Sequence, residues 1–151
     1  MFAGDYALTL DEKNRLVIPA MFRSFIAASD REGLFLLVRP TRTERCLRAY
    51  PATYMQKVKL NILREAGKVE DPEEFLRAVM PQMQFTPLDS QGRFVVPQKL
   101  VDYAGLGREV LMVGMTEWIE VWDPKEYRVA SERSREKYKD RLGRVLWAEG
   151  S

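Results

Sequence analysis

The sequence contains no histidine among its 151 residues and a single cysteine, Cys46. The lack of histidine excludes Ser-His-Asp triads, imidazole general bases and metal sites with histidine ligands. One cysteine cannot form an intrachain disulfide or a CxxC zinc site, and it is typical of a reduced, cytoplasmic setting. We therefore expect no metal and no cofactor. Because no nucleophile–base pair is evident, we do not expect an enzyme.

Long apolar runs are also missing. The longest uncharged run covers residues 78–88 and contains Pro81 and Pro87, so we expect no membrane-spanning segment. The first residues turn acidic at Asp5 and lack the basic-then-apolar order of a signal peptide. A composition of 46% hydrophobic and 30% charged residues is typical of a soluble globular chain with one domain or two small ones.

The same short motif occurs twice in the chain. Residues 10–19 (LDEKNRLVIP) and residues 88–97 (LDSQGRFVVP) align without a gap at an offset of 78 residues, and five of the ten positions are identical. The similarity continues beyond the motif, with small changes of offset of the kind that loops tolerate. We interpret the chain as two copies of one module, residues 5–53 and 83–126, with a helical connector, residues 54–82, and a charged C-terminal helix or tail, residues 127–151.

Each copy is expected to begin with a hairpin. The alternating residues 6–10 and the β-branched residues 16–18 predict two strands that pair with each other. The turn between them ends at Asn14 in the first copy and at Gly92 in the second, two residue types that tolerate a positive φ. The residue before the arginine of the motif is therefore predicted to be left-handed.

One short helix and two more strands are predicted for the rest of each copy. Pro19 and Pro97 end the second strand and suit the first turn of a helix. In the first copy, Phe22, Phe25 and Ile26 recur at helical spacing. A unit of about 45 residues cannot close a core alone. The copies must therefore pack on each other or on other chains, and one barrel built from both is the preferred arrangement.

Further helices are predicted outside the two copies. Residues 51–67 carry apolar side chains on one face and end at a glycine. An Asp-Pro pair, a typical helix start, precedes a short helix over residues 73–80. The same pair precedes a charged helix that continues to about Leu142.

The net charge of +2 is distributed unevenly. Residues 39–68 hold eight basic and two acidic residues, whereas residues 69–126 hold five basic and eleven acidic ones. A segregated basic face raises the local potential even in a nearly neutral protein and can attract nucleic acid. The same distribution also fits an oligomer in which acidic second copies dock against basic first copies, and both interpretations stay open.

The turn motif supplies the candidate binding residues. Arg15 has a second cation, Lys13, beside it. A two-stranded ribbon fits the major groove of DNA, where arginine can form two hydrogen bonds with guanine and lysine can meet a phosphate. Asp11 and Asp89 are interpreted mainly as structural residues, because an aspartate at this position can accept hydrogen bonds from the amides of the turn.

In the second copy the same chemistry is expected to be weaker. Arg93 takes the position of Arg15, but Gln91 replaces Lys13 and the neighbouring residues are acidic. We therefore predict that Arg93 contributes less to DNA binding than Arg15.

The start MFAGDYALTLDEKNRLVIPAMFR and the later segment LDSQGRFVVPQKL closely resemble the MraZ family, bacterial proteins with two tandem AbrB-like modules. The resemblance covers nearly the whole chain and rests on both copies of D-x-x-x-R-[LF]-V-x-P. It implies an α+β, mainly β fold, namely a double swapped-hairpin AbrB-like β-barrel with flanking helices. It also implies a homo-oligomeric ring, often an octamer, that lies in the cytoplasm with the nucleoid.

A regulatory role follows from the same resemblance. It implies sequence-specific binding to double-stranded DNA, at short direct repeats in the promoter of the protein's own division and cell-wall gene cluster. Glycine is usual in the family at the position of Asn14, and lysine is frequent at that of Gln91. The matching residues are those expected to contact DNA (Lys13, Asn14, Arg15 and, more weakly, Arg93) and those expected to shape the motif (Asp11, Asp89, Gly92, Pro19 and Pro97).

A competing class is a protein-interaction module. Antitoxins of similar fold hold toxins, and an AbrB-type module could in the same way hold a protein partner. The tail from Asp123 onward could serve that purpose. Such a protein would show little salt-sensitive affinity for DNA.

Overall fold

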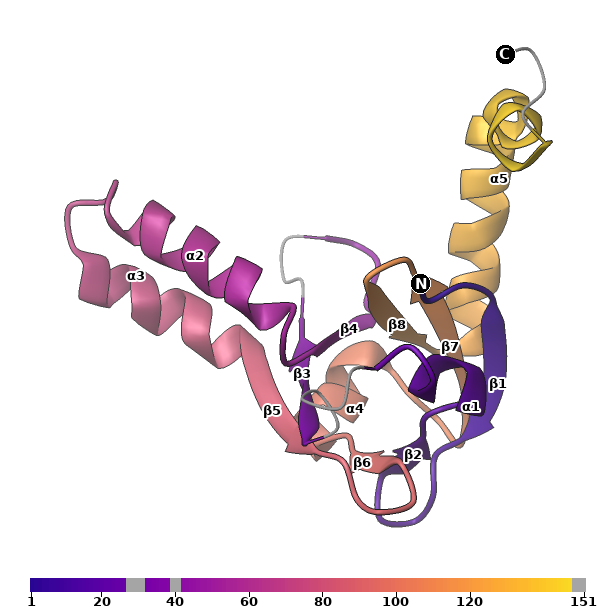
Figure 1. Ribbon diagram of the computed structural model, residues 1–151, viewed down its shortest axis with the longest axis horizontal. Helices are drawn as coiled ribbons and strands as arrows, with labels where there is room; N and C mark the ends of the chain where they lie inside the picture. Colours follow the sequence, from indigo (N-terminus) through magenta and orange to yellow (C-terminus); the bar gives the residue numbers. More distant parts are fainter. Residues whose placement is uncertain (27–31, 39–41, 148–151) are drawn as a thin grey trace.

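The computed structural model describes residues 1–26, 32–38 and 42–147. The order strand, strand, helix, strand, strand occurs twice along the chain (Figure 1). The first set is β1 (Asp5–Thr9), β2 (Arg15–Val17), α1 (Ala20–Arg23), β3 (Gly33–Leu37) and β4 (Leu47–Pro51). The second set is β5 (Met83–Pro87), β6 (Arg93–Val95), α4 (Gln98–Ala104), β7 (Glu109–Met115) and β8 (Trp118–Trp122).

The strands form one large antiparallel sheet and one separate ribbon. The sheet has the order β1-β7-β8-β4-β3-β5, and the ribbon consists of β2 and β6. In the sheet, β1 pairs with β7 and β5 pairs with β3, so the first strand of each set lies on a strand of the other set. The predicted pairing of the first two strands with each other is therefore wrong. The alternation of apolar residues defines which face of a strand is buried, but it does not define the partner.

The fold is α+β with mostly antiparallel strands, but the predicted closed barrel is not found. Among the described residues, β1 and β5 are the two edges of the large sheet and do not pair with each other. The ribbon forms its own two-stranded sheet beside it. Two short strands give the ribbon few backbone hydrogen bonds, so its position depends on the side chains that it buries.

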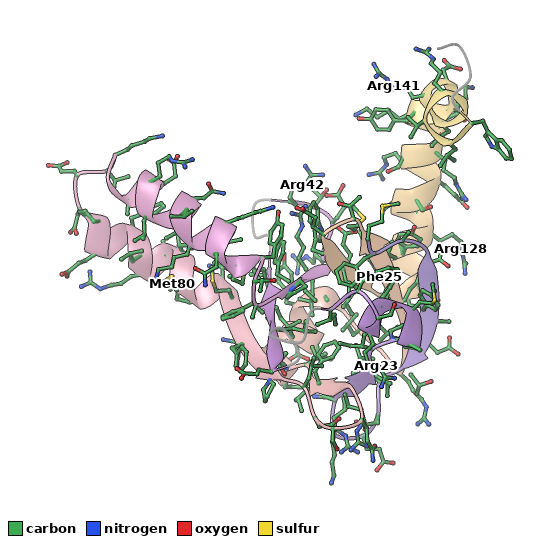
Figure 2. All side chains as sticks on the ribbon, viewed as in Figure 1. Arg23, Phe25, Arg42, Met80, Arg128 and Arg141 are labelled. Atoms are coloured by element: carbon green, nitrogen blue, oxygen red, sulfur yellow. The ribbon has the colours of Figure 1, made fainter. Side chains whose placement is uncertain are left out.

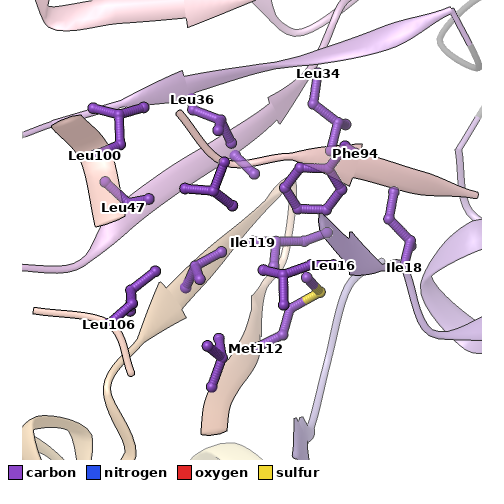
Figure 3. Close-up of a cluster of buried hydrophobic side chains, with 14 of the residues drawn as sticks. Leu16, Ile18, Leu34, Leu36, Leu47, Phe94, Leu100, Leu106, Met112 and Ile119 are labelled. Carbon is purple, nitrogen blue, oxygen red and sulfur yellow. The ribbon is translucent and has the colours of Figure 1, made fainter. Parts of the chain in front are cut away.

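The hydrophobic core lies between one face of the large sheet and the inner face of the ribbon (Figure 3). Leu16 and Phe94 occupy opposite positions in the ribbon, and both are almost fully buried. The large sheet supplies the facing side chains because alternate residues of its strands point to the same side. The largest fully buried side chains are Leu16, Ile18, Phe22, Leu34, Leu36, Leu47, Phe94, Val96, Val110, Met112, Ile119 and Val121.

The two helices that follow the prolines are short and cover the core. Phe22 and Ile26 are buried, as their spacing suggests, but Phe25 is 50% exposed. Phe25 and Ile26 both lie beyond the end of α1 at Arg23, where helical spacing no longer sets their direction: Ile26 joins the core, and Phe25 packs edge-to-face on Phe2 near the surface. Pro19 and Pro97 stand just before the first helical residue, with φ near −55°. The sequence suggested that both prolines lie in the first turn of a helix, but each is the N-cap residue that precedes it.

A helical hairpin and a long C-terminal helix project from the body of the molecule (Figure 1). The hairpin consists of α2 (Met55–Ala66) and α3 (Pro72–Val79), followed by a 3-10 turn (Met80–Gln82). Asp71 caps α3, since its carboxylate accepts a hydrogen bond of 3.2 Å from the amide of Glu74. The predicted apolar face of α2 is only partly covered, because Leu63 is 54% exposed.

The C-terminal helix α5 (Pro124–Trp147) is longer than predicted and has a kink at Tyr138, where φ is −113°. Its first turns pack on the outer face of the large sheet, where Trp122 and Tyr127 form an edge-to-face pair beside the buried Cys46. Further along, its apolar side chains are exposed. No helix within the described ranges combines the length and the apolar character needed to cross a membrane.

Candidate nucleic-acid interface

The ribbon β2–β6 carries both motif arginines on its outer face. Arg15 lies opposite Val95, and Arg93 lies opposite Val17. Because Leu16 and Phe94 point inward, these four residues point to the other side. Val17 and Val95 are 43% and 45% exposed. The outer face is therefore a small, solvent-facing surface with two guanidinium groups and two branched apolar side chains.

An aspartate closes the turn before Arg15 and orients that side chain. One carboxylate oxygen of Asp11, Oδ1, accepts hydrogen bonds from the amides of Lys13 (2.9 Å) and Arg15 (2.8 Å). The other oxygen, Oδ2, accepts a bond of 2.7 Å from Nε of Arg15. Asn14 has a φ of 58°, which confirms the predicted left-handed position. Because the carboxylate binds both the backbone and the side chain of the arginine, the guanidinium is held in one orientation.

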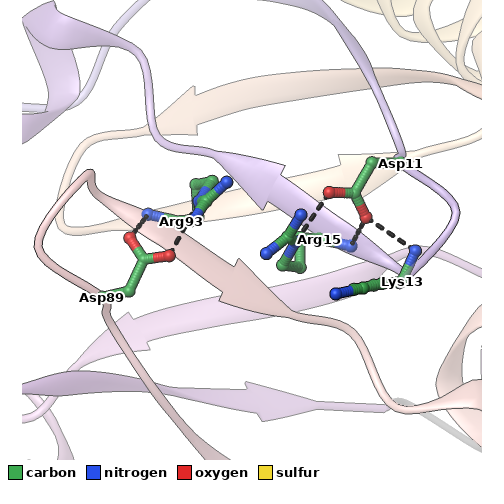
Figure 4. A network of polar contacts seen from close by, with 5 residues as sticks. All are labelled: Asp11, Lys13, Arg15, Asp89 and Arg93. Atoms are coloured by element: carbon green, nitrogen blue, oxygen red, sulfur yellow. Dashed lines mark hydrogen bonds and ion pairs between the residues drawn. The ribbon is translucent and has the colours of Figure 1, made fainter.

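The turn before Arg93 has the same geometry. Oδ1 of Asp89 accepts hydrogen bonds of 2.9 Å from the amides of Gln91 and Arg93, and Oδ2 accepts one of 2.7 Å from Nε of Arg93. Gly92 has a φ of 74°, in agreement with the prediction. Figure 4 shows the two arginine side chains between the two aspartates on the ribbon.

Each arginine keeps donors for a ligand. With the residues that the structure describes, the side chains of Arg15 and Arg93 bond to aspartate through Nε alone. Nη1 and Nη2 therefore remain available, and two parallel N–H donors match O6 and N7 of guanine in the major groove. Both arginine side chains are 29% exposed, so their hydration is already reduced before a ligand binds.

Acid is expected to weaken both turns. The pKa of Asp11 is lowered from its ordinary value of 3.8, chiefly by the hydrogen bond from the Arg15 amide and further by the Arg15 side chain. The pKa of Asp89 is lowered in the same way by Arg93. A carboxyl group whose pKa is lower in the folded protein than in the unfolded chain stabilises the fold. This stabilisation is complete at pH values above the pKa of the unfolded chain, and it is lost as the pH falls through the pKa of the folded protein.

The free energy of unfolding should therefore be flat near neutral pH and fall below roughly pH 4. Urea unfolding at a series of pH values would measure it. The double variant Asp11→Asn, Asp89→Asn lacks both titrating groups, so it should lose less stability on acidification than the parent. An identical acid loss in both proteins would contradict this origin.

The two turns differ in what surrounds them. Lys13 is exposed at the first turn. The side-chain amide of Asn14 donates a bond of 2.9 Å to Oε1 of Gln98, on α4. The amide of Asn14, which the sequence suggested as a DNA contact, is thus engaged within the protein.

Within the described part of the chain, no group of three or more metal-ligating side chains occurs.

Comparison with known proteins places the chain in a family. The family model described as "MraZ protein, putative antitoxin-like" matches residues 1–61 and 82–145, which include both motifs and most of the chain. This chain belongs to the MraZ family. The gap between the matched stretches falls on α3 and the end of α2, so the connector is where the MraZ family pattern is interrupted.

Relatives named "Transcriptional regulator MraZ" match almost end to end. The one from Cutibacterium acnes is 33% identical over 147 residues, covering 97% of this chain and 98% of the relative. The one from Thermomicrobium roseum is 33% identical and covers 87% and 88%. The one from Leuconostoc citreum is 31% identical and covers 93% of each.

Two further arginines lie beside the turns and were not found from the sequence. Arg108 lines a shallow hollow with Asp11, Lys13 and Arg15 at the first turn. Arg23, at the end of α1, lines another hollow at the second turn. Both come from parts of the chain remote from the turn they flank. The MraZ family motif is local in sequence, so it gives no signal for either residue.

Proposed function

We propose that this chain is a sequence-specific, DNA-binding transcriptional regulator whose ribbon β2–β6 enters the major groove. The observation that carries the proposal is the pair of motif arginines, oriented by aspartates on one exposed antiparallel ribbon. Two-stranded ribbons are known readers of the major groove. The names of the relatives support a regulatory role.

The residues divide into readers and supports. In this proposal, Arg15 reads a base, and Lys13 and Asn14 lie next to the sugar-phosphate backbone of the DNA. Arg93 contributes more weakly to DNA binding. The supporting residues fix the turns and the strand ends, and they are Asp11, Asp89, Gly92, Pro19 and Pro97. Base contacts give specificity and phosphate contacts give position and affinity, so the two sets should respond differently to DNA sequence and to salt.

The assembly and target are also proposed. Two AbrB-like modules, residues 5–53 and 83–126, would form one double swapped-hairpin unit, flanked by the segments 54–82 and 127–151. Several units would form a ring-shaped homo-oligomer, with an octamer as the expected size, in the cytoplasm at the nucleoid. The ring would bind direct repeats in the promoter of its own division and cell-wall gene cluster. Repeated weak contacts add by avidity, which suits a chain with a net charge of only +2.

A second candidate function is that of an antitoxin-like module that holds a protein partner. The end of α5 favours it, because Val145, Leu146 and Trp147 are 77%, 72% and 78% exposed. Exposed apolar groups of this size often mark a contact surface. The description of the matched family also contains the term antitoxin-like.

Fluorescence anisotropy separates the two functions. A labelled duplex from upstream of the protein's own gene is titrated with the full chain, with an unlabelled scrambled duplex as competitor, at several salt concentrations. A DNA reader should keep binding its duplex in the presence of the competitor, and its affinity should fall steeply with salt. Equal affinity for both duplexes, or no binding, would overturn the DNA proposal and favour a protein partner.

A further inference from the structure

The two ends of the ribbon are built differently although their turns share one geometry. Because β2 and β6 are antiparallel, the turn before β2 and the turn before β6 lie at opposite ends of the ribbon. The first turn carries the cation Lys13, whereas the equivalent residue of the second turn is the neutral Gln91. The second end nevertheless has a cation beside it, because Arg23 is brought there by α1 from the first half of the chain.

Arg23 lies directly against the second turn. A Cβ atom added to Gly92 would be 3.0 Å from Cδ, Nε and Cζ of Arg23. The same arginine lines a hollow with Ser90 and Asp89. Figure 2 shows Arg23 on the body of the molecule, whereas Arg128 and Arg141 lie on α5. The side chain of Arg23 therefore lies against the turn at Gly92, although the two residues are far apart in the sequence.

The side chain of Arg23 is exposed, and it makes no ion pair with the residues that the structure describes. The carboxylate that lines the hollow, that of Asp89, is already bound by Nε of Arg93 at 2.7 Å. An exposed cation beside a second, oriented cation raises the positive potential at this end of the ribbon.

The absence of a side chain at position 92 makes room for Arg23. At the first turn the equivalent position is Asn14, whose amide bonds Gln98 from α4. Each turn is thus flanked by the helix that follows the other strand of the ribbon. The first turn receives a neutral amide from α4, and the second receives a cation from α1.

We propose that Arg23 is a further DNA-binding residue, which contacts a phosphate at the second turn as Lys13 does at the first. This inference rests on the proposed function. Each strand of the ribbon is three residues long, or about 10 Å, and the major groove is about 12 Å wide. With Arg15 and Arg93 facing the bases, Lys13 and Arg23 at the two ends face phosphates on opposite sides of the groove.

The first test replaces the charge. Arg23→Gln should weaken binding roughly three- to tenfold on the gene's own duplex and on the scrambled duplex alike, because a phosphate contact carries no sequence information. The affinity should also depend less on salt: the plot of log affinity against log salt should become shallower by about 0.9 for each phosphate that the variant no longer neutralises. Arg23→Lys should restore both the affinity and the slope. Arg77→Gln is the matched control, since Arg77 is exposed on α3 and pairs with Glu73 of the same helix.

The second test moves Arg23 without changing it. Gly92→Asn copies the residue that adopts a φ of 58° at position 14, so the turn should form, but its Cβ would lie 3.0 Å from Arg23 and force that side chain to move. It should weaken binding about as much as Arg23→Gln, and the double variant should bind little more weakly than either single variant. Circular dichroism checks that each variant is folded.

The outcomes separate the two proposals. If Arg23→Gln and Gly92→Asn bind both duplexes as the parent does, while Arg15→Ala weakens binding, the assignment of Arg23 is overturned and the proposed function stands. If the parent itself does not bind its own duplex in preference to the scrambled one, both are overturned. A weakening by Arg23→Gln that Arg23→Lys does not restore would also count against a phosphate contact.

Discussion

Replacing Phe94 with alanine should lower the free energy of unfolding by about 3–5 kcal/mol, because the change removes a buried aromatic ring and leaves a cavity. Phe94 is only 1% exposed, and it lies opposite Leu16, which is fully buried. These two side chains are the inner face of the ribbon. Since total stabilities are about 5–15 kcal/mol, a decrease of this size threatens the fold itself.

The same replacement should also disturb the outer face of the ribbon. Arg93 and Val95 are the neighbours of Phe94 in β6, and the strand has only three residues. With few backbone hydrogen bonds, the ribbon is held on the core by Leu16, Phe94, Ile18 and Val96. We therefore expect the Phe94→Ala variant to bind DNA weakly even under conditions in which it remains folded.

Urea unfolding at a fixed protein concentration measures the effect, since an oligomer's apparent stability depends on concentration. Val95→Ala is the matched control in the same strand. Val95 is 45% exposed, and a surface replacement of this kind changes stability by about 0.5 kcal/mol or less. Equal unfolding midpoints for the two variants would show that the ribbon is not anchored through Phe94.

The turns, and the residues that share one face of a strand, could be predicted from the sequence because they depend on neighbouring residues. A positive φ at Asn14 and Gly92 follows from the residue types between two short strands. A strand period of two places Leu16 on the same face as Ile18, and Phe94 on the same face as Val96. Both features are local, and tertiary structure does not override them.

Pairing across the two halves could not be predicted in the same way. The first strand of each half could pair with the strand that follows it in the chain or with a strand of the other half, because the two halves have similar patterns. The choice is made by long-range contacts, such as the bond of 2.8 Å from the amide of Leu10 to the carbonyl of Arg108. Arg23 was missed for the same reason, since its position beside Gly92 exists only in the folded chain.

Replacing Arg15 with alanine should weaken binding to the gene's own duplex by about 1–3 kcal/mol for each ribbon that reads it, the value of a good two-bond contact between arginine and guanine. In a ring the effects at several ribbons would multiply, so binding could fall below detection. The turn itself should persist, because Oδ1 of Asp11 accepts hydrogen bonds from the backbone amides of residues 13 and 15, and the variant loses only the bond from the Arg15 side chain to Oδ2.

Arg15→Lys separates shape from charge. A lysine keeps the positive charge but has no planar fork, so it cannot make the paired hydrogen bonds of arginine. Anisotropy with the two duplexes should show that Arg15→Lys binds the scrambled duplex about as the parent does but no longer prefers the gene's own duplex. Arg77→Ala, far from the ribbon, should bind as the parent does. If Arg15→Ala leaves both affinity and salt dependence unchanged in an intact assembly, the bases are not read by this ribbon.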